Sequence, residues 1–509
     1  MNNSSRVAFN TIINYSQLVL NVIVGILSVR IVLRSLGEVD YGIYNLVAGV
    51  VAIIAFISES LSQTSVRFLS VSLGRKITEH TKNIFSSCFS MHLYMALGLT
   101  IVLEIAGFVL FDSFLNIPAN RVYAAKIVFQ CMIATLFINI IATPFRSIII
   151  AHEKFSYIAI IGVVESILKL LVALCVYYVI CDKLILYGLL MTLISLLYLI
   201  CLLFCAFYKF NIYISLHLLS IKRIKSVASF AGWTLLDVFG AIANRQGYAI
   251  MLNAFFGPET NAVFALAQHV ESPLFSVSAS AINSIKPQIL KSYGESDVQR
   301  MTRLAFTAGK LGFSLMAMIA IPICITLPRV LDVWLGVYPP TTVFFARMMI
   351  IACLANQLTL GLATANQAYG KIKWFSIIVS SIRISALPIS IVFLMFGFPA
   401  YVSMVVFAVC ESLASFSRLL VMNHVAKISI RYFCKDVILR ILPSVCLAIF
   451  FSILIQVQLS KNIWTLMLNI AASAFIYAYS MYLWGLTRNE LSSVKNIVSM
   501  ILSKIKLAR

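Results

Sequence analysis

Charged residues are scarce in this chain of 509 residues: 11% are Asp, Glu, Lys or Arg, whereas 61% are hydrophobic. Soluble globular domains carry about 25% charged residues, so the composition excludes that class. The sequence also lacks any long polar segment between its apolar runs. This lack excludes a folded domain outside the membrane, and it argues against a membrane enzyme whose active site is built in a large external loop.

The eleven cysteines show no spacing that is typical of a metal site or a disulfide framework. The closest pair, Cys201 and Cys205, lies within an apolar run. We therefore expect the cysteines to act as small apolar residues, and we expect no metal and no other cofactor. The amino-terminal segment MNNSSRVAFN lacks a small-residue cleavage motif and leads into a long apolar stretch, so we expect a retained first span.

Apolar runs of about 20 residues or more recur along the whole chain, which is the length that an α-helix needs to cross the hydrocarbon layer. The alternating ten-residue pattern of a transmembrane β-barrel is missing. The sequence therefore predicts an all-α polytopic membrane protein with about 14 transmembrane helices. The expected spans are 8–33, 41–66, 84–110, 122–149, 157–181, 184–207, 226–256, 260–285, 304–328, 341–369, 375–396, 399–424, 437–458 and 462–484.

One hairpin of apolar segments occurs twice in the sequence. The stretch SVRIVLRSLGEVDYGIYNLV aligns without a gap to a later stretch, in which Gly257 takes the place of Gly37 and Phe264 that of Tyr44. Each copy opens a set of six spans, and because six is an even number, both sets enter from the same side of the membrane. The sequence therefore predicts two parallel six-helix lobes, with the last two spans as an appended hairpin.

The repeats set the expected domain limits. Two further segments, one between the lobes and one after the last span, carry apolar residues at helical spacing and basic residues on other faces. This pattern is typical of helices that lie on a membrane surface. The limits are 1–208 for the N-terminal six-helix lobe, 209–225 for a cytoplasmic interfacial linker, 226–425 for the C-terminal six-helix lobe, 436–484 for the appended transmembrane hairpin and 488–509 for a cytoplasmic basic amphipathic tail.

Basic residues are unevenly distributed between the two sides of the expected spans. Most of the 39 Lys and Arg fall in connections on one side, and this positive-inside asymmetry puts both termini in the cytoplasm. The other side has only short connections, such as 37–40, 112–121 and 182–183. The net charge of +21 is therefore a topology signal whose partners are anionic membrane lipids, and we expect no nucleic acid.

Polar residues form stripes on two spans that occupy equivalent places in the repeats. Asn14, Gln17 and Asn21 share one face of the first span, and Asp237 and Asn244 share one face of the seventh. Two interpretations are open. The stripes line a central aqueous cavity, or their amides hold helices together within a lobe.

Ionisable residues inside the spans mark candidate functional positions, because charge is costly in hydrocarbon. The cations without an obvious partner outnumber the acids, which favours an anionic ligand, since a guanidinium fork suits phosphate and carboxylate. The cations are Arg30, Arg245, Arg347 and Arg383, and the acids are Glu59, Asp237 and Glu271.

Several of these charges have a structural alternative. Arg30 and Arg34 lie opposite the polar stripe on a straight helix, where a long side chain snorkels to the interface, unless a bend near Gly25 turns Arg30 toward the cavity. Arg383 is equally consistent with a satisfied polar pair. Elsewhere, the four-residue spacing of Glu165 and Lys169 predicts an ion pair within one helix.

Three stretches carry a resemblance to a known family. The stretches RIVLRSLGEVDYGIYNLV, FFGPETNAVFALA and ANQAYGKIKWFSIIVSSIRISALPISIVFLMFGFPAY resemble the Wzx-type O-antigen and polysaccharide flippases of the multidrug/oligosaccharidyl-lipid/polysaccharide exporter superfamily. The resemblance covers nearly the whole chain. It implies two six-helix lobes that form a V around a central cavity, plus a C-terminal helix pair.

The resemblance also implies a function. A flippase of this kind is not an enzyme; it moves an oligosaccharide linked to undecaprenyl diphosphate from the cytoplasmic to the periplasmic leaflet of the bacterial inner membrane by alternating access. Relatives use cavity arginines, and Arg30 and Arg245 are the positions here that match best. A polysaccharide polymerase and the chain-length machinery are the implied protein partners.

These expectations combine into one hypothesis for the site. Arg30, Arg245 and Arg383 hold the diphosphate, and a set of polar side chains contacts sugar. The sugar contacts are Asn14, Gln17, Asn21, Asn244 and Tyr248. Glu59, Asp237 and Glu271 are the candidates for coupling to a proton or sodium gradient, and uncoupled movement is equally open.

Three other functions stay open at this point. A multidrug or cation antiporter of the same superfamily predicts an acidic cavity, whereas the buried charges here lean cationic. The first span has Asn14, Gln17 and Asn21 where many multidrug members have a buried aspartate. A lipid II flippase shares the architecture, and a membrane polysaccharide polymerase requires the external loop that the sequence lacks.

Overall fold

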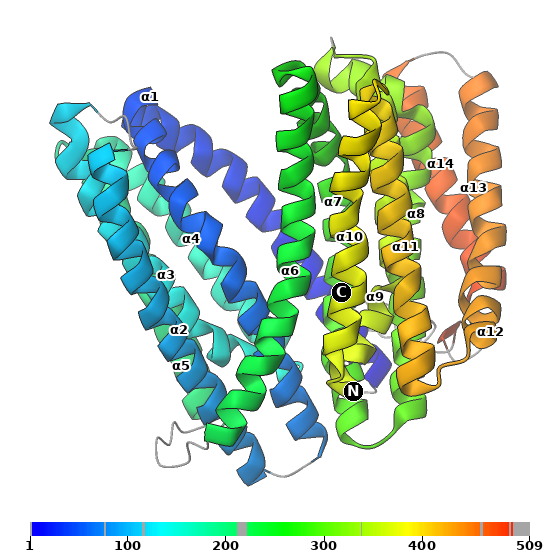
Figure 1. Ribbon diagram of the computed structural model, residues 1–509, viewed down its shortest axis with the longest axis horizontal. Helices are drawn as coiled ribbons and strands as arrows, with labels where there is room; N and C mark the ends of the chain where they lie inside the picture. Colours follow the sequence, from blue (N-terminus) through cyan, green and yellow to red (C-terminus); the bar gives the residue numbers. More distant parts are fainter. Residues whose placement is uncertain are drawn as a thin grey trace, which may run out of the picture. The chain divides into compact units, whose positions relative to one another are not determined.

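The computed structural model describes residues 3–75, 78–113, 118–210, 221–336, 338–458, 462–487 and 490–491. Within these ranges the chain is helical, without strands (Figure 1). The helices are α1 (Asn3–Gly74), α2 (Thr78–Ser113), α3 (Val122–Ala151), α4 (Phe155–Tyr178), α5 (Lys183–Phe210), α6 (Ile221–Phe256), α7 (Pro258–Gly294), α8 (Val298–Leu335), α9 (Thr341–Tyr369), α10 (Ile372–Met395), α11 (Ala400–Ala426), α12 (Ile430–Phe433), α13 (Leu439–Gln458) and α14 (Ile463–Ser480).

The prediction of about 14 membrane helices is confirmed. Among the described residues, 11 helical segments are long and apolar enough to cross a membrane, and each overlaps one expected span. The other three expected spans are helical as well: two are the arms of α1, and the third is α7, which has 37 residues but is more polar.

A glycine interrupts the helix at the same place in each repeat. Gly37 interrupts α1 with φ 78° and ψ 171°, and Gly257 separates α6 from α7 with φ 79° and ψ −176°. This region of backbone space is essentially open only to glycine. The two predicted hairpins therefore turn by the same local mechanism.

The described helices divide into two compact units. The N-terminal unit contains Ile12–Val238, and the C-terminal unit contains Phe239–Arg509 with Met1–Thr11. The boundary falls inside α6 and not in the predicted linker 209–225, of which residues 211–220 lie outside the described part of the chain. The predicted tail 488–509 also lies outside it, apart from Glu490 and Leu491.

An ion cluster joins three connections at one end of the N-terminal unit. Arg121, just before α3, donates to both carboxylate oxygens of Asp40 in α1. It also donates to Asp182, which precedes α5, at 2.8 Å. These residues belong to the three connections 37–40, 112–121 and 182–183 that were predicted to share one membrane face, and they do lie together.

Close helix contacts hold the C-terminal unit together. A Cβ added at Gly361 of α9 would lie 2.0 Å from the backbone oxygen of Ala305 in α8, so only glycine permits this crossing. The hairpin of α13 and α14 packs against α8 (Figure 1). Its two helices are joined by buried hydrogen bonds between Ser452 and Asn469. The appended hairpin is thus an integral part of this unit.

A second ion pair ties the end of the hairpin to α8. Lys310 is 2% exposed, and its ammonium donates to the carboxylate of Glu490 and to the backbone oxygen of Gly485. Glu490 also accepts from Thr307 of α8 and from the backbone N–H of Thr487. The start of the tail is therefore fixed to the C-terminal unit.

Candidate functional site

The strongest candidate site in the C-terminal unit starts at an ion pair between α6 and α7. Nη2 of Arg245 donates to both carboxylate oxygens of Glu271, at 3.0 and 3.1 Å. The Glu271 side chain is 4% exposed, whereas that of Arg245 is 46% exposed. In the described structure Nε and Nη1 of Arg245 have no protein acceptor, so a buried acid holds a guanidinium whose other donors are open.

Polar side chains of two further helices continue from this ion pair. The thiol of Cys353 in α9 lies against Glu271, and Gln357 follows one turn later on α9. Gln357 is fully buried and accepts from Ser278 of α7 at 2.7 Å. Its Nε2 donates to no nitrogen or oxygen in the part of the chain that the structure describes. The Arg245–Glu271 pair is therefore the exposed end of a row of buried polar side chains that runs from α6 to α9.

A second polar cluster joins α9, α10 and α11. Nε of Arg383 donates to Glu411 at 3.2 Å, and the Arg383 side chain is 6% exposed. Arg418 is 3% exposed and donates to the side chain of Asn356 at 3.2 Å. Asn356 and Gln357 are neighbours in α9, so both clusters reach the same turn of that helix, and together they are called the polar layer of the C-terminal unit.

Formal charge in this layer leans cationic. The three arginines Arg245, Arg383 and Arg418 stand against the two glutamates Glu271 and Glu411. The prediction that Arg245 and Glu271 lack a partner is wrong, because they pair with each other across two helices. For Arg383 the alternative of a satisfied polar pair is confirmed, since it pairs with Glu411 on the next helix. The two ion pairs neutralise most of the positive charge that an anion would bind, and an excess of one arginine remains.

The predicted site residue Asn244 lies on the face of α6 that packs on α10. A Cβ at Gly240 would lie 3.1 Å from Ser380, and one at Gly247 would lie 2.4 Å from Leu387. Asn244 falls between these contacts, beside the stretch of α10 that contains Arg383. It is 1% exposed, and neither polar atom of its amide has a hydrogen-bond partner among the described residues.

Tyr248, one turn further along α6, packs inside the C-terminal unit. Its side chain is fully buried, and its hydroxyl lies 2.7 Å from Ser390 Oγ and 3.2 Å from the backbone oxygen of Ala386. Its ring stacks against Phe264 and meets the edge of Phe407. In this arrangement the side chain holds α6 to α10, and its predicted contact with sugar stays a prediction.

Arg347, also predicted to be unpaired, has a backbone partner. Pro328 lacks an N–H, so the carbonyl of Cys324, four residues earlier in α8, receives no helical hydrogen bond. Nε of Arg347 donates to that oxygen at 3.0 Å. Its guanidinium thus satisfies a carbonyl that proline leaves open.

In the N-terminal unit, the polar stripe of α1 faces another helix. Nε2 of Gln17 lies against Gly162 of α4, where an added Cβ would be 2.1 Å away. Oδ1 of Asn21 accepts from Ser166 of α4 at 2.7 Å. This arrangement matches the second interpretation of the stripe, in which amides hold helices together within a lobe.

The predicted Glu165–Lys169 ion pair is confirmed, with Nζ and Oε1 2.6 Å apart. Glu59 is exposed and accepts from Gln63 at 3.2 Å. Asp237 is half-buried and lies close in sequence to the boundary of the two units. The side chains of Arg30 and Asn14 lie outside the described part of the chain, so their roles stay predictions.

The ion pairs follow a rule that sequence reasoning missed. Residues at equal distances from a hairpin turn lie at the same depth. Arg245 and Glu271 stand almost symmetrically about the turn at Gly257, and Arg383 and Glu411 stand symmetrically about the turn at Gly397. Asn356 and Gln357 were missed too, although two adjacent amides inside an apolar helix are themselves a signal.

Comparison with known proteins gives one family and one fold. The family model described as "Polysaccharide biosynthesis protein" matches residues 7–292. No curated protein matches the chain. Among solved structures, a MATE transporter in the bent conformation is similar over 83% of this chain and 94% of that chain, with a TM-score of 0.72 and 15% identity.

Two other solved structures share this fold. A transporter of the MOP superfamily from Pyrococcus furiosus, described as having a binding pocket of reverse polarity, covers 83% of this chain and 94% of its own, with a TM-score of 0.69 and 14% identity. A multidrug resistance MATE family transporter in an outward-facing conformation covers 83% and 94%, with a TM-score of 0.66 and 15% identity. At these identities the likeness establishes the fold.

Proposed function

Because the chain belongs to the polysaccharide biosynthesis protein family, we propose that it is a flippase that moves an oligosaccharide linked to undecaprenyl diphosphate across the bacterial inner membrane. Its multi-pass helical fold is that of MOP-superfamily transporters. The movement runs from the cytoplasmic to the periplasmic leaflet by alternating access, with both termini in the cytoplasm. The chain catalyses no chemical reaction on its substrate.

The observation that carries this proposal is the half-exposed guanidinium of Arg245. Glu271 binds one of its nitrogens, and the open Nε and Nη1 donors are suited to the oxygens of a phosphate or an acidic sugar. An uncompensated diphosphate costs many kcal/mol in hydrocarbon, so a cation that Glu271 already holds in place lowers that barrier. Arg383 and Arg30 are the further cations in this proposal.

Charge in the polar layer also bears on the multidrug alternative. A site for organic cations requires a net negative charge. Three arginines against two glutamates give the opposite sign, which favours an anionic cargo. Glu271 is then chiefly the group that holds Arg245, and Glu59 and Asp237 remain the candidates for ion coupling.

The decisive experiment is neutralisation of Arg245. In a strain that lacks the chromosomal gene, Arg245→Gln should abolish surface polysaccharide while membrane levels of the protein stay normal. Arg34→Gln is the matched control, because Arg34 is an exposed arginine at the end of an arm of α1. Normal polymer in Arg245→Gln cells would refute the assignment.

Transport in vesicles separates the possible couplings. Flipping of a fluorescent lipid-linked oligosaccharide should be measured with a proton gradient, with a sodium gradient and with neither. If Glu59 or Asp237 couples transport to a gradient, the Gln or Asn variant should lose the stimulation and keep the basal rate. Equal rates under all three conditions would assign uncoupled movement.

The partners named by the sequence belong to the same proposal. A polymerase and the chain-length machinery would take up the flipped unit on the periplasmic side, and anionic lipids would contact the basic cytoplasmic connections. Crosslinking in cells that make polysaccharide, compared with cells that lack the polymerase, tests the protein partner.

A further inference from the structure

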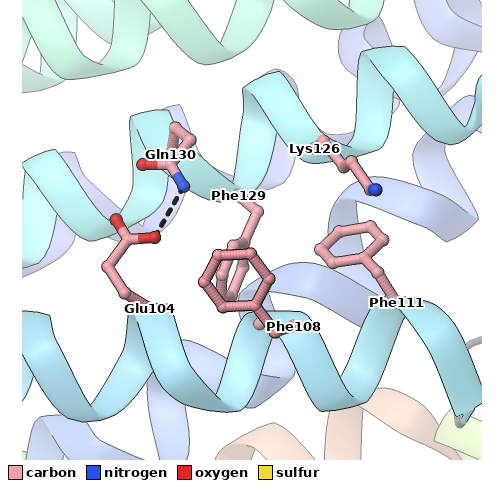
Figure 2. Close-up of a pocket in the computed structure, with 7 residues that line it drawn as sticks. Glu104, Phe108, Phe111, Lys126, Phe129 and Gln130 are labelled. Atoms are coloured by element: carbon pink, nitrogen blue, oxygen red, sulfur yellow. Dashed lines mark hydrogen bonds between the residues drawn. The ribbon is translucent and has the colours of Figure 1, made fainter.

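A groove on the N-terminal unit lies outside the site described above. It runs between α2 and α3, and the rings of Phe108, Phe111 and Phe129 line it (Figure 2). Gly107 shapes it, because a Cβ there would lie 2.5 Å from the ring of Phe129. Glycine thus lets the ring of Phe129 pack directly against the backbone of α2.

The groove opens onto an apolar surface at membrane depth. Phe108 is 74% exposed, and Ile101 and Ile105 on the same helix are 59% and 61% exposed. All three lie in the candidate membrane span Thr81–Phe108. Lipid acyl chains are therefore expected to contact this surface.

Two polar levels stand along the groove, one helical turn apart. Lys126 is exposed, and its ammonium lies 5.8 Å from the centroid of the Phe111 ring. Gln130, four residues and about 6 Å further along α3, donates through Nε2 to Glu104 at 2.9 Å. Figure 2 shows Lys126 at one end of the row of rings and the Glu104–Gln130 pair at the other.

These polar groups are incompletely satisfied by the protein. Neither Lys126 nor Glu104 forms an ion pair within the described ranges. Glu104 takes one N–H of the Gln130 amide and so fixes its orientation, which leaves the second N–H for another acceptor. Lys126 follows Arg121 by five residues in the sequence, and the ion cluster of Arg121 lies at the end of the N-terminal unit where the helices are connected. The cation is therefore the shallower of the two levels.

We infer that this groove binds one glycerophospholipid. The lipid phosphate pairs with Lys126, an ester carbonyl accepts the open N–H of Gln130, and an acyl chain lies across the three phenyl rings. In such a lipid the phosphate is separated from the ester carbonyls by the glycerol unit and lies closer to water, which matches the order and the spacing of Lys126 and Gln130. A free phosphate would leave the aromatic floor uncovered.

Native mass spectrometry of the full-length protein tests this inference. After delipidation in mild detergent, addition of phosphatidylethanolamine or phosphatidylglycerol should give a complex with one tightly held lipid. Dioleoylglycerol, which has the same esters and chains but no phosphate, should bind at least tenfold more weakly. Equal retention of dioleoylglycerol would overturn the inference.

Matched variants separate the groove from general lipid adhesion. Lys126→Glu and Gln130→Leu should each lose the tightly held lipid, and Lys126→Arg should keep it, which shows that the variants report on the cation and not on folding. Lys183→Ala is the control, since Lys183 begins α5 at the same end of the unit and lies away from the groove. The inference fails if all variants retain the lipid equally, or if the wild type retains no lipid. It fails as well if a bound peptide occupies the groove in place of the lipid. It does not depend on the cargo, so transport assays leave it unaffected.

Discussion

Gly37 and Gly257 hold equivalent places in the two repeats and adopt the same backbone conformation, with φ of 78° and 79°. Each turns the chain between two membrane helices. Apart from the adjoining residues, no described atom lies within 4 Å of the position that a Cβ would take at either residue, so the need for glycine there arises from the backbone and not from crowding.

The first prediction concerns these two turns. Gly37→Ala and Gly257→Ala should each cost about 1 to 3 kcal/mol of stability, since a Cβ strains this backbone region. Gly98→Ala is the control: Gly98 also has open space at its Cβ position but lies inside α2, where alanine is favoured by about 1 kcal/mol. Thermal unfolding in detergent measures all three. Equal melting temperatures for Gly37→Ala and Gly98→Ala would contradict the prediction.

The second prediction concerns the pH dependence of the Arg121 cluster. The pKa of Asp182 is lowered from its usual value: burial acts to raise it, but the N–H of Ile185 and the guanidinium of Arg121 outweigh that effect. A lowered folded-state pKa stabilises the protein above the usual carboxyl pKa of about 4, and this stability is lost as the pH falls below it.

Asp182→Asn tests this dependence. The wild type should lose about 0.5 to 1 kcal/mol more than the variant between pH 6 and pH 3, the small size reflecting an ion pair whose side chains are 23% and 34% exposed. Melting temperatures across that range provide the measurement. Parallel pH profiles for the two proteins would show that the cluster contributes nothing through this carboxyl.

The third prediction concerns the Lys310–Glu490 pair. Glu490→Leu leaves an ammonium that is 2% exposed without its carboxylate, which should cost about 3 to 5 kcal/mol. The double variant Lys310→Met/Glu490→Leu removes both charges and should recover most of that loss. A double-mutant cycle on unfolding measures the coupling, and additive single effects would show that the pair is not coupled.

The sequence predicts the helices better than it predicts the contacts between them. Hydropathy is local, so the spans and the hairpin at Gly37 follow from runs of residues. Whether Arg245 is paired depends on Glu271 on the next helix, and single-helix spacing cannot reveal it. Comparing residues at equal distances from Gly257 or Gly397 would have found both ion pairs, because a tight turn puts such residues at one depth.

The amides of α1 illustrate a different limit. The spacing of Gln17 and Asn21 predicts that they share one face of a helix, but a polar face is compatible with water or with another polar helix. The choice depends on Gly162 and Ser166 of α4, a helix that is distant in the sequence. No periodicity within α1 distinguishes the two environments.

The fourth prediction separates packing from substrate binding at Tyr248. Tyr248→Phe removes the hydroxyl that contacts Ser390 and Ala386, so it should cost about 1 kcal/mol of stability. It keeps the buried ring against Phe264, and surface polysaccharide should therefore stay near the wild-type level. Ser390→Ala is the matched variant, because it removes the partner of the same hydrogen bond and should have a similar effect on unfolding. Lost polysaccharide in Tyr248→Phe, with normal polymer in Ser390→Ala, would restore the sugar contact predicted from the sequence.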